Sequence, residues 1–229
     1  MSDHSLLRLQ SWLSPSFPTG AYAYSHGLEW AVDTGHVRDR DELIDWLAAD
    51  LRHGSGRNEA IFFVEAWRCA TAQHDERLFR VAALAAAFRG TSELALESSQ
   101  QGCACLATLR RAWPDRVLER LSERMRECDV APVLSVVLGA RAARERLPMS
   151  LALSLFLQAQ IANLVTAGVR LIPLGQTDGQ LAIAGLEETI LATREAARTA
   201  TLDELGSAAF MVDMASTAHE MQYTRLFRS

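Results

Sequence analysis

Residues 39–54 read DRDELIDWLAADLRHG, and this stretch shows the fold class most clearly. Asp39 and Glu42 have the spacing of a capping box, in which the first side chain and the fourth satisfy free backbone N–H groups at a helix start. Apolar residues then recur at helical spacing, namely Ile44, Leu47, Ala48 and Leu51. Gly54 is placed to end the helix. The pattern predicts an α-helix that begins after Asp39 and ends before Gly54.

Similar signals recur on both sides of this stretch, whereas alternating strand patterns are nearly absent. We expect further helices at 58–72, 76–88, 91–112, 115–127, 133–144 and 179–197, with breaks at Gly90, Pro114, Pro132 and Pro173. Pro148 is placed to open another helix at its first turn. No linker or repeat separates these segments, and the connections are short. The sequence predicts an all-α protein, a single-domain bundle of roughly ten helices that spans residues 1–229.

Thr201 and Glu204 repeat the capping-box spacing near the end of the chain. Apolar residues follow them, namely Leu205, Ala208, Ala209, Val212 and Ala215. The pattern predicts one more helix that begins at Thr201. A tail at about 219–229 then carries aromatic, aliphatic and Arg residues where many chains end in small polar ones.

Composition excludes several classes of function. The formal net charge is −5, so the field of the whole molecule repels nucleic acid. All 23 basic residues are Arg, because the sequence contains no Lys. A Walker A loop, a Schiff base and a pyridoxal site all require a Lys amine. We therefore expect no nucleic-acid partner and no nucleotide-binding loop of that kind.

The four cysteines are Cys69, Cys103, Cys105 and Cys128, and no signal peptide is visible before them. This usage indicates a reducing, cytoplasmic location. Cys103 and Cys105 are two residues apart, so on a helix their side chains point in nearly opposite directions and cannot share a metal ion. Packing in the core is the favoured interpretation, and no metal site is predicted.

Residues 149–169 contain no charge and are long enough to span a bilayer. Polar residues interrupt the segment repeatedly, at Ser150, Ser154, Gln158, Gln160, Asn163 and Thr166. Much of its hydrophobicity comes from Ala. A buried central helix therefore fits the segment better than a membrane span.

The usual catalytic constellations are missing from the sequence. It contains neither the Glu-x-x-His of di-iron bundles nor the His-Glu-x-x-His of zinc proteases. Ser25-His26-Gly27 resembles half of a nucleophile elbow, but Ala23 replaces the preceding Gly and no strand leads into it. We predict no catalytic residues and expect that the protein is not an enzyme.

All three tyrosines lie near the two ends of the chain, at Tyr22, Tyr24 and Tyr223. A phenol offers apolar area together with a hydrogen bond, so this placement favours recognition over packing. Two segments carry these residues: the turn and helix start at 13–30, and the tail. A tail that folds back on its own domain is the alternative to one that waits for a partner.

The sequence resembles the UreF family of urease accessory proteins through three anchors in the same order. The first is Ser14-Pro15-x-Phe17-Pro18-x-Gly20-Ala21-Tyr22-x-Tyr24-Ser25-His26-Gly27-Leu28-Glu29. The second comprises Asn163-Leu164-Val165 and Arg170-Leu171-Ile172-Pro173-Leu174-Gly175-Gln176-Thr177. The third is His219-Glu220-x-Gln222-Tyr223-x-Arg225-Leu226-Phe227-Arg228-Ser229. The segment at 93–102 is only roughly similar, and Cys103 and Cys105 depart from the family pattern.

The resemblance implies a non-catalytic scaffold that forms a homodimer, binds a UreD-type protein (UreH in some systems) and recruits the nickel-carrying GTPase UreG. Nickel would then pass to apo-urease, and nickel and GTP would be handled by the partners, with no cofactor bound stably here. The expected partner-binding residues are those of the anchors: Tyr22, Tyr24, His26, Glu29, Gln176, His219, Glu220, Tyr223, Arg225, Leu226, Phe227 and Arg228.

We further expect the tail to become ordered when the UreD-type partner docks, with Tyr223, Leu226 and Phe227 as anchors. Two rival classes stay open on sequence grounds. One is an all-α enzyme with an unrecognised pocket, and the other is a metal-storing protein that uses His26, His219 and the cysteines.

Overall fold

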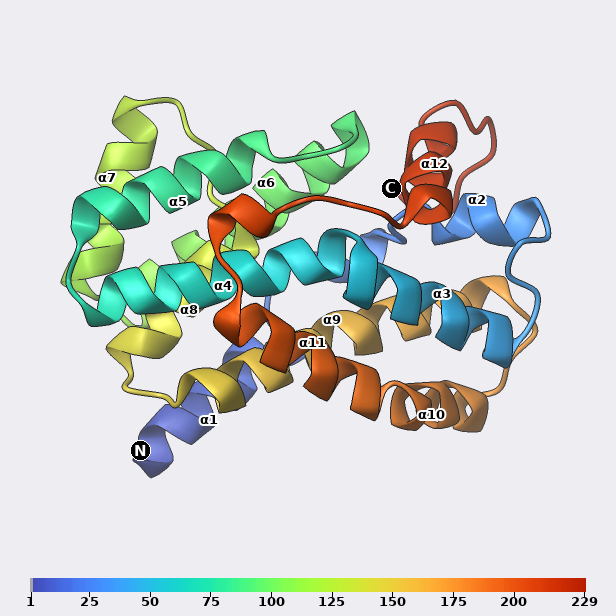
Figure 1. Cartoon of the computed structure of the whole chain (residues 1–229), viewed down its shortest axis with the longest axis horizontal. Coiled ribbons are helices and arrows are strands. Elements are labelled where there is room, and N and C mark those ends of the chain that lie inside the picture. Colours follow the sequence, from blue (N-terminus) through green and yellow to red (C-terminus); the bar gives the residue numbers. More distant parts are fainter. Residues whose placement is uncertain (1) are drawn as a thin grey trace.

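The computed structural model describes residues 2–229, and within them it contains twelve α-helices, two short 3-10 helices and no strand. The all-α prediction is confirmed (Figure 1). The first half of the chain forms α1 Asp3–Trp12, η1 Ala21–Ala23, α2 Leu28–Asp33, α3 Arg40–His53, α4 Ser55–Thr71, α5 Asp75–Ala87 and α6 Ser92–Ala112. The second half forms α7 Arg116–Glu127, α8 Leu134–Arg144, α9 Met149–Leu171, α10 Gln176–Gly185, α11 Glu187–Thr199, η2 Leu202–Glu204 and α12 Phe210–His219.

Helix α4 lies at the centre of the bundle and packs against α8, α5, α3, α11 and α9. Its side chains are buried on almost every side, and Phe62 and Phe63 are among the largest fully buried residues. The backbone of α8 comes very close to that of α4, because a Cβ added at Gly139 would lie 2.4 Å from the Phe63 carbonyl oxygen. A helix that is apolar all round belongs in the interior.

Helix α9 contains the uncharged segment 149–169 and ends just after Arg170. By length and composition alone it is long and apolar enough to cross a bilayer. In the structure it packs against α10, α11, α4 and α2, and half of its most apolar window is buried. Its position is that of a core helix of the bundle.

The predicted helix at 39–54 is present as α3, but its start differs in detail from a capping box. The Asp39 carboxylate accepts hydrogen bonds from the N–H groups of Asp41 and Glu42. The Glu42 carboxylate instead accepts from the Arg38 N–H at 2.7 Å and pairs with the Arg38 guanidinium. Gly54 ends the helix as predicted.

Two predictions about the second half of the chain are wrong. The expected helix at 179–197 is two helices, α10 and α11, with the break at Leu186. Leu186 is fully buried, so the turn anchors the pair in the core. The helix expected to begin at Thr201 stops after η2, although the Thr201–Glu204 capping box is present.

Tertiary hydrogen bonds explain the interruption after η2. The Gly206 N–H donates to the Asn58 side chain, and the Ala208 N–H donates to the His53 carbonyl. These bonds hold the chain in an extended path, so α12 begins only at Phe210. Helix α12 then lies beside α2, with the end of the chain next to both (Figure 1).

Candidate functional site

The candidate site is the place where α12 and the tail meet α2 and α6, which joins the first and third sequence anchors. Gly27 precedes α2 in a left-handed conformation with φ of 75°. A Cβ on this residue would lie 2.5 Å from the Ser216 backbone nitrogen in α12. A glycine is therefore required here both for its backbone angle and for the close approach of α12.

The tail pairs its backbone with the segment before α2. The Ser25 N–H donates to the Ser229 carbonyl at 2.7 Å, and the Arg228 N–H donates to the Ala23 carbonyl at 2.8 Å. Phe227 is 4% exposed, and the Arg170 guanidinium lies 4.4 Å from its ring centroid. The tail is thus folded back on its own chain, in contrast to the expectation that it becomes ordered only with a partner.

Two buried carboxylates, those of Glu29 and Glu93, hold the tail through hydrogen bonds and an ion pair. Glu29 accepts from the N–H of Leu226 at 2.6 Å and from that of Phe227 at 2.9 Å. Glu93 pairs with Arg225 at 2.5 Å. Between the carboxylates lies His219, fully buried, with its Nε2 3.2 Å from Glu29 and its Nδ1 2.7 Å from Glu93.

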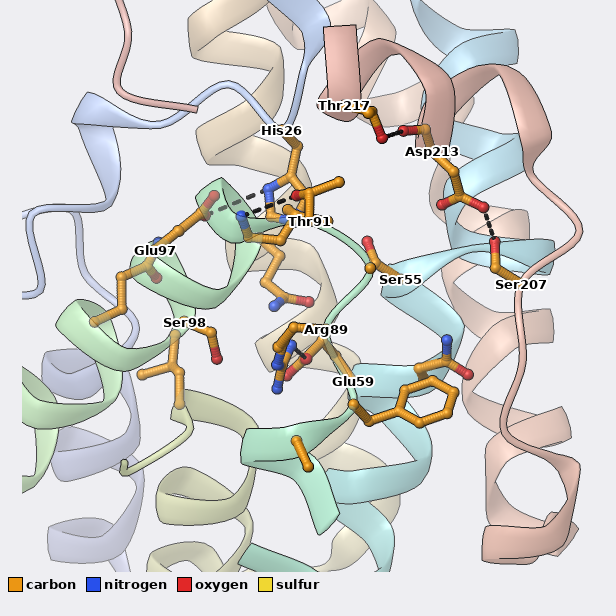
Figure 2. Close-up of a pocket in the computed structure, with 18 residues that line it drawn as sticks. His26, Ser55, Glu59, Arg89, Thr91, Glu97, Ser98, Ser207, Asp213 and Thr217 are labelled. Carbon is orange, nitrogen blue, oxygen red and sulfur yellow. Dashed lines mark hydrogen bonds and ion pairs between the residues drawn. The ribbon is translucent and has the colours of Figure 1, made fainter. Parts of the chain in front are cut away.

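A pocket of about 410 Å³ opens beside this cluster, between α4, α6 and α12 (Figure 2). Its wall combines apolar side chains such as Phe88 and Leu94 with the buried ion pair of Arg89 and Glu59. His26 points from the loop before α2 toward Glu97, and its Nδ1 lies 3.3 Å from that carboxylate (Figure 2).

Charges around the pocket shift the titration of its side chains. Burial by itself lowers the pKa of His26, but the attraction of Glu97, with smaller contributions from Asp50 and Glu59, outweighs it and raises the pKa to about 9. Burial opposes ionisation of Glu97, yet His26, Ser229 and Arg89 together leave the pKa of Glu97 below its usual value. Burial raises the pKa of Asp50. At neutral pH His26 and Glu97 therefore form a charged pair.

The described residues 2–229 contain no group of three or more His, Cys, Asp or Glu side chains arranged to hold a metal ion. Cys105 is buried in the core, as expected, but the expectation of core packing is wrong for Cys103, which is exposed because residues two apart lie on opposite sides of α6. Cys69 is buried and Cys128 is exposed.

The structure sorts the residues that we expected to bind partners into two groups. Several are exposed, namely Tyr22, Gln176, Tyr223, Arg225, Leu226 and Arg228. Others are buried and face the interior of the same chain: Tyr24, Glu29, His219 and Phe227. His26 and Glu220 are partly buried. Gln176 begins α10 and lies well away from α12 and the tail (Figure 1).

The buried group cannot contact a partner directly in this conformation. Tyr24 is 2% exposed, and its hydroxyl donates to Gln100. The partly buried Glu220 also has a partner within the chain, because it accepts from the Ser92 N–H at the start of α6. Tyr24 and Glu220 make these contacts within the chain. They can therefore affect a partner only indirectly, by determining where the tail lies.

Sequence reasoning missed Glu93 and Glu97, which complete the site from α6. One signal was available, because two carboxylates one turn apart on a helix repel unless each has its own partner. Those partners, His219 and His26, come from distant parts of the chain and carry no local signature.

Apolar side chains are exposed around the same end of the molecule. Phe210 and Met214 on α12 are 72% and 57% exposed, and Tyr223 in the tail is fully exposed. Met221 and Leu226 are also exposed. Large apolar side chains in water near one another mark surfaces that other proteins cover.

Comparison with known proteins agrees with these features. A family model described as UreF matches residues 37–187. The urease accessory protein UreF of Rhodopseudomonas palustris strain HaA2 is 46% identical over 98% of this chain and 94% of its own length. That of strain BisB5 is also 46% identical, over 98% of this chain and 91% of its own length. The Bradyrhizobium diazoefficiens protein of the same name is 44% identical, over 98% of this chain and 92% of its own length.

The fold and the matches therefore define an all-α accessory protein. It belongs to the UreF family of urease accessory proteins, as the three sequence anchors predicted.

Proposed function

We propose that this protein is a scaffold for urease maturation that bridges a UreD-type (UreH-type) accessory protein and the nickel-carrying GTPase UreG. It acts in the cytoplasm as a homodimer and supports nickel insertion into apo-urease. Membership of the UreF family over nearly the whole chain is the observation that carries the proposal.

The surface at the carboxy-terminal end supports this assignment. Tyr223, Leu226 and Met221 are exposed, while residues on either side of them are anchored in the interior. An aromatic residue on a fixed backbone loses little conformational freedom when a partner covers it, which favours binding. We therefore assign partner contact to the exposed group, with Tyr223 and Leu226 as anchors.

Nickel and GTP belong to the partners in this proposal. The sequence has no Lys for a Walker A loop, so GTP is bound and hydrolysed by the UreG-type protein. Nickel is cargo that passes to apo-urease. Tight stoichiometric nickel binding by the isolated chain would favour the metal-storing class instead.

The test is reconstitution in cells that express apo-urease and all accessory proteins except the UreF-type one. Supplying this chain should restore urease activity and the nickel content of the purified urease together. A Tyr223→Ala variant should restore much less of both, whereas a Glu195→Gln variant, altered on the exposed face of α11, should match the unaltered chain. Urease that stays nickel-free with the unaltered chain would contradict the proposed function.

A further inference from the structure

The cluster of Glu29, Glu93 and His219 offers an inference about how the tail is presented. These residues come from α2, α6 and α12, and all three are at least nine-tenths buried. Arg225 completes the set from the tail. The cluster is therefore the point where three helices that are distant in sequence are held together with the tail that follows α12.

The hydrogen bonds around the two carboxylates indicate that both are ionised. Glu29 accepts from two backbone N–H groups, those of Leu226 and Phe227. Glu93 accepts from the Arg225 guanidinium. Backbone N–H groups and a guanidinium can only donate, so they stabilise the charged form of each acid.

The protonation of His219 follows from its two neighbours. Its Nδ1 faces Glu93 and its Nε2 faces Glu29, each within hydrogen-bonding distance. A neutral imidazole has one N–H and one lone pair, and the lone pair would face a carboxylate. The side chain is 0% exposed, so water cannot intervene. A hydrogen bond to each carboxylate would require a proton on both nitrogens.

Charge balance agrees with this assignment. Glu29 and Glu93 contribute two negative charges, and His219 and Arg225 contribute two positive charges. Buried charges are tolerated when they are paired and hydrogen-bonded in this way. Other charged groups nearby are already paired: Glu97 with His26 one turn further along α6, Asp33 with Gln222, and Glu220 with the start of α6.

We infer that Glu29, Glu93 and a doubly protonated His219 are positioning residues that hold the tail in its partner-binding conformation, without touching the partner themselves. The inference rests on the proposed function for the partner, a UreD-type accessory protein. The exposed Tyr223 and Leu226 lie between the anchored residues His219 and Phe227, so the cluster determines where these two side chains are displayed.

The first test measures the protonation of His219 directly in the unaltered chain. Nitrogen-15 NMR of the full chain at neutral pH should show both ring nitrogens of His219 protonated, identified by the loss of the signals in His219→Gln. A ring nitrogen without a proton would overturn the assignment of the imidazolium.

The second test measures the tail in Glu29→Gln and Glu93→Gln. The Gln amide presents an NH₂ group where a native carboxylate oxygen accepts a hydrogen bond, so Glu29→Gln loses one of its bonds to the tail. Hydrogen exchange at the Leu226 and Phe227 amides should accelerate roughly tenfold or more, as expected for a lost hydrogen bond to a charged group. Affinity for the UreD-type protein should fall in parallel, while helical circular dichroism stays unchanged.

Asp33→Asn is the matched control, because Asp33 is also on α2 and contacts the tail at Gln222, but at the exposed surface. It should leave exchange and affinity close to those of the unaltered chain. If the unaltered chain binds the UreD-type protein and both Glu variants show unchanged exchange and affinity, the inference is overturned while the proposed function stands. If the unaltered chain fails to bind the UreD-type protein, the proposed function fails, and the NMR result still decides the state of His219.

Discussion

His26 illustrates how a single residue links several parts of this molecule. It has a left-handed backbone with φ of 57°, which directs the chain into α2, and its side chain pairs with Glu97 on α6. Glu97 in turn accepts from the Ser229 hydroxyl of the tail. The charge on His26 therefore stabilises contacts between the segment before α2, α6 and the tail.

The raised pKa of His26 predicts a specific pH dependence. The pKa of His26 is about 9 in the folded protein, whereas its ordinary value is 6.5, which applies to the unfolded chain. The folded state therefore holds the proton of His26 more tightly than the unfolded state does. This stabilisation is complete below about pH 6.5 and is lost as the pH rises to about 9. We expect the free energy of unfolding to fall over this interval by on the order of 1–3 kcal/mol.

Urea unfolding at several pH values between 6 and 9.5 measures this effect. His26→Asn is the comparison, since Asn tolerates a left-handed backbone but does not titrate. The variant should be less stable at pH 6.5 and should show a flatter profile. Identical slopes for the two proteins would show that His26 does not carry the effect.

The polar residues of the site could be predicted from the sequence only in part. The anchors contain Glu29, His26 and His219, so their importance was visible, but they were expected to face a partner. The structure turns Glu29 and His219 inward, because each finds an opposite charge on an element that is distant in sequence. Sequence spacing cannot show such pairs when their members are more than a hundred residues apart.

At the scale of elements, the packing of α12 on the start of α2 depends on Gly27. The Cβ of any other residue would lie within 3 Å of three backbone atoms of α12, and backbone cannot move aside as a flexible side chain can. Helix α12 carries His219, so a displacement there would also disturb the cluster that holds the tail.

Gly27→Ala should therefore destabilise the protein by about 2 kcal/mol or more, because left-handed strain adds to the collision with α12. Gly35→Ala is the matched control: it has a similar φ of 77°, but nothing lies within 4 Å of its added Cβ. It should cost only the backbone strain, about 1–2 kcal/mol. Chemical denaturation of both variants measures the difference, and equal losses would contradict the close-approach argument.

The helices themselves were largely predictable from local signals. Capping residues and apolar periodicity located α3, and Pro148 located the start of α9. Local signals gave wrong helix boundaries where tertiary contacts determine the path of the backbone. Buried Leu186 divides a continuous helical pattern, and hydrogen bonds to α3 and α4 hold residues 206–208 out of a helix.

At the scale of the whole molecule, the segment just before α2 and the carboxy-terminal tail meet to form one site, while α1 at the amino terminus lies on the other side of the bundle (Figure 1). The segment before α2 and the tail share backbone hydrogen bonds, and α6 supplies the carboxylates that join them to the bundle. Contact between these two segments explains why the first and third sequence anchors, although some 190 residues apart, belong to one site. The tail is therefore a folded element that presents a surface, and not a loose extension.

The most direct test is size-exclusion chromatography with light scattering on this chain, mixed with the UreD-type protein and the GTP-loaded UreG-type protein. The full-length chain should form one defined complex that contains all three proteins. A chain that ends at Glu220 and the Tyr223→Ala variant, both shown to be helical by circular dichroism, should not form it. If both variants assemble as well as the full-length chain, or if the full-length chain does not assemble at all, the central claim is contradicted.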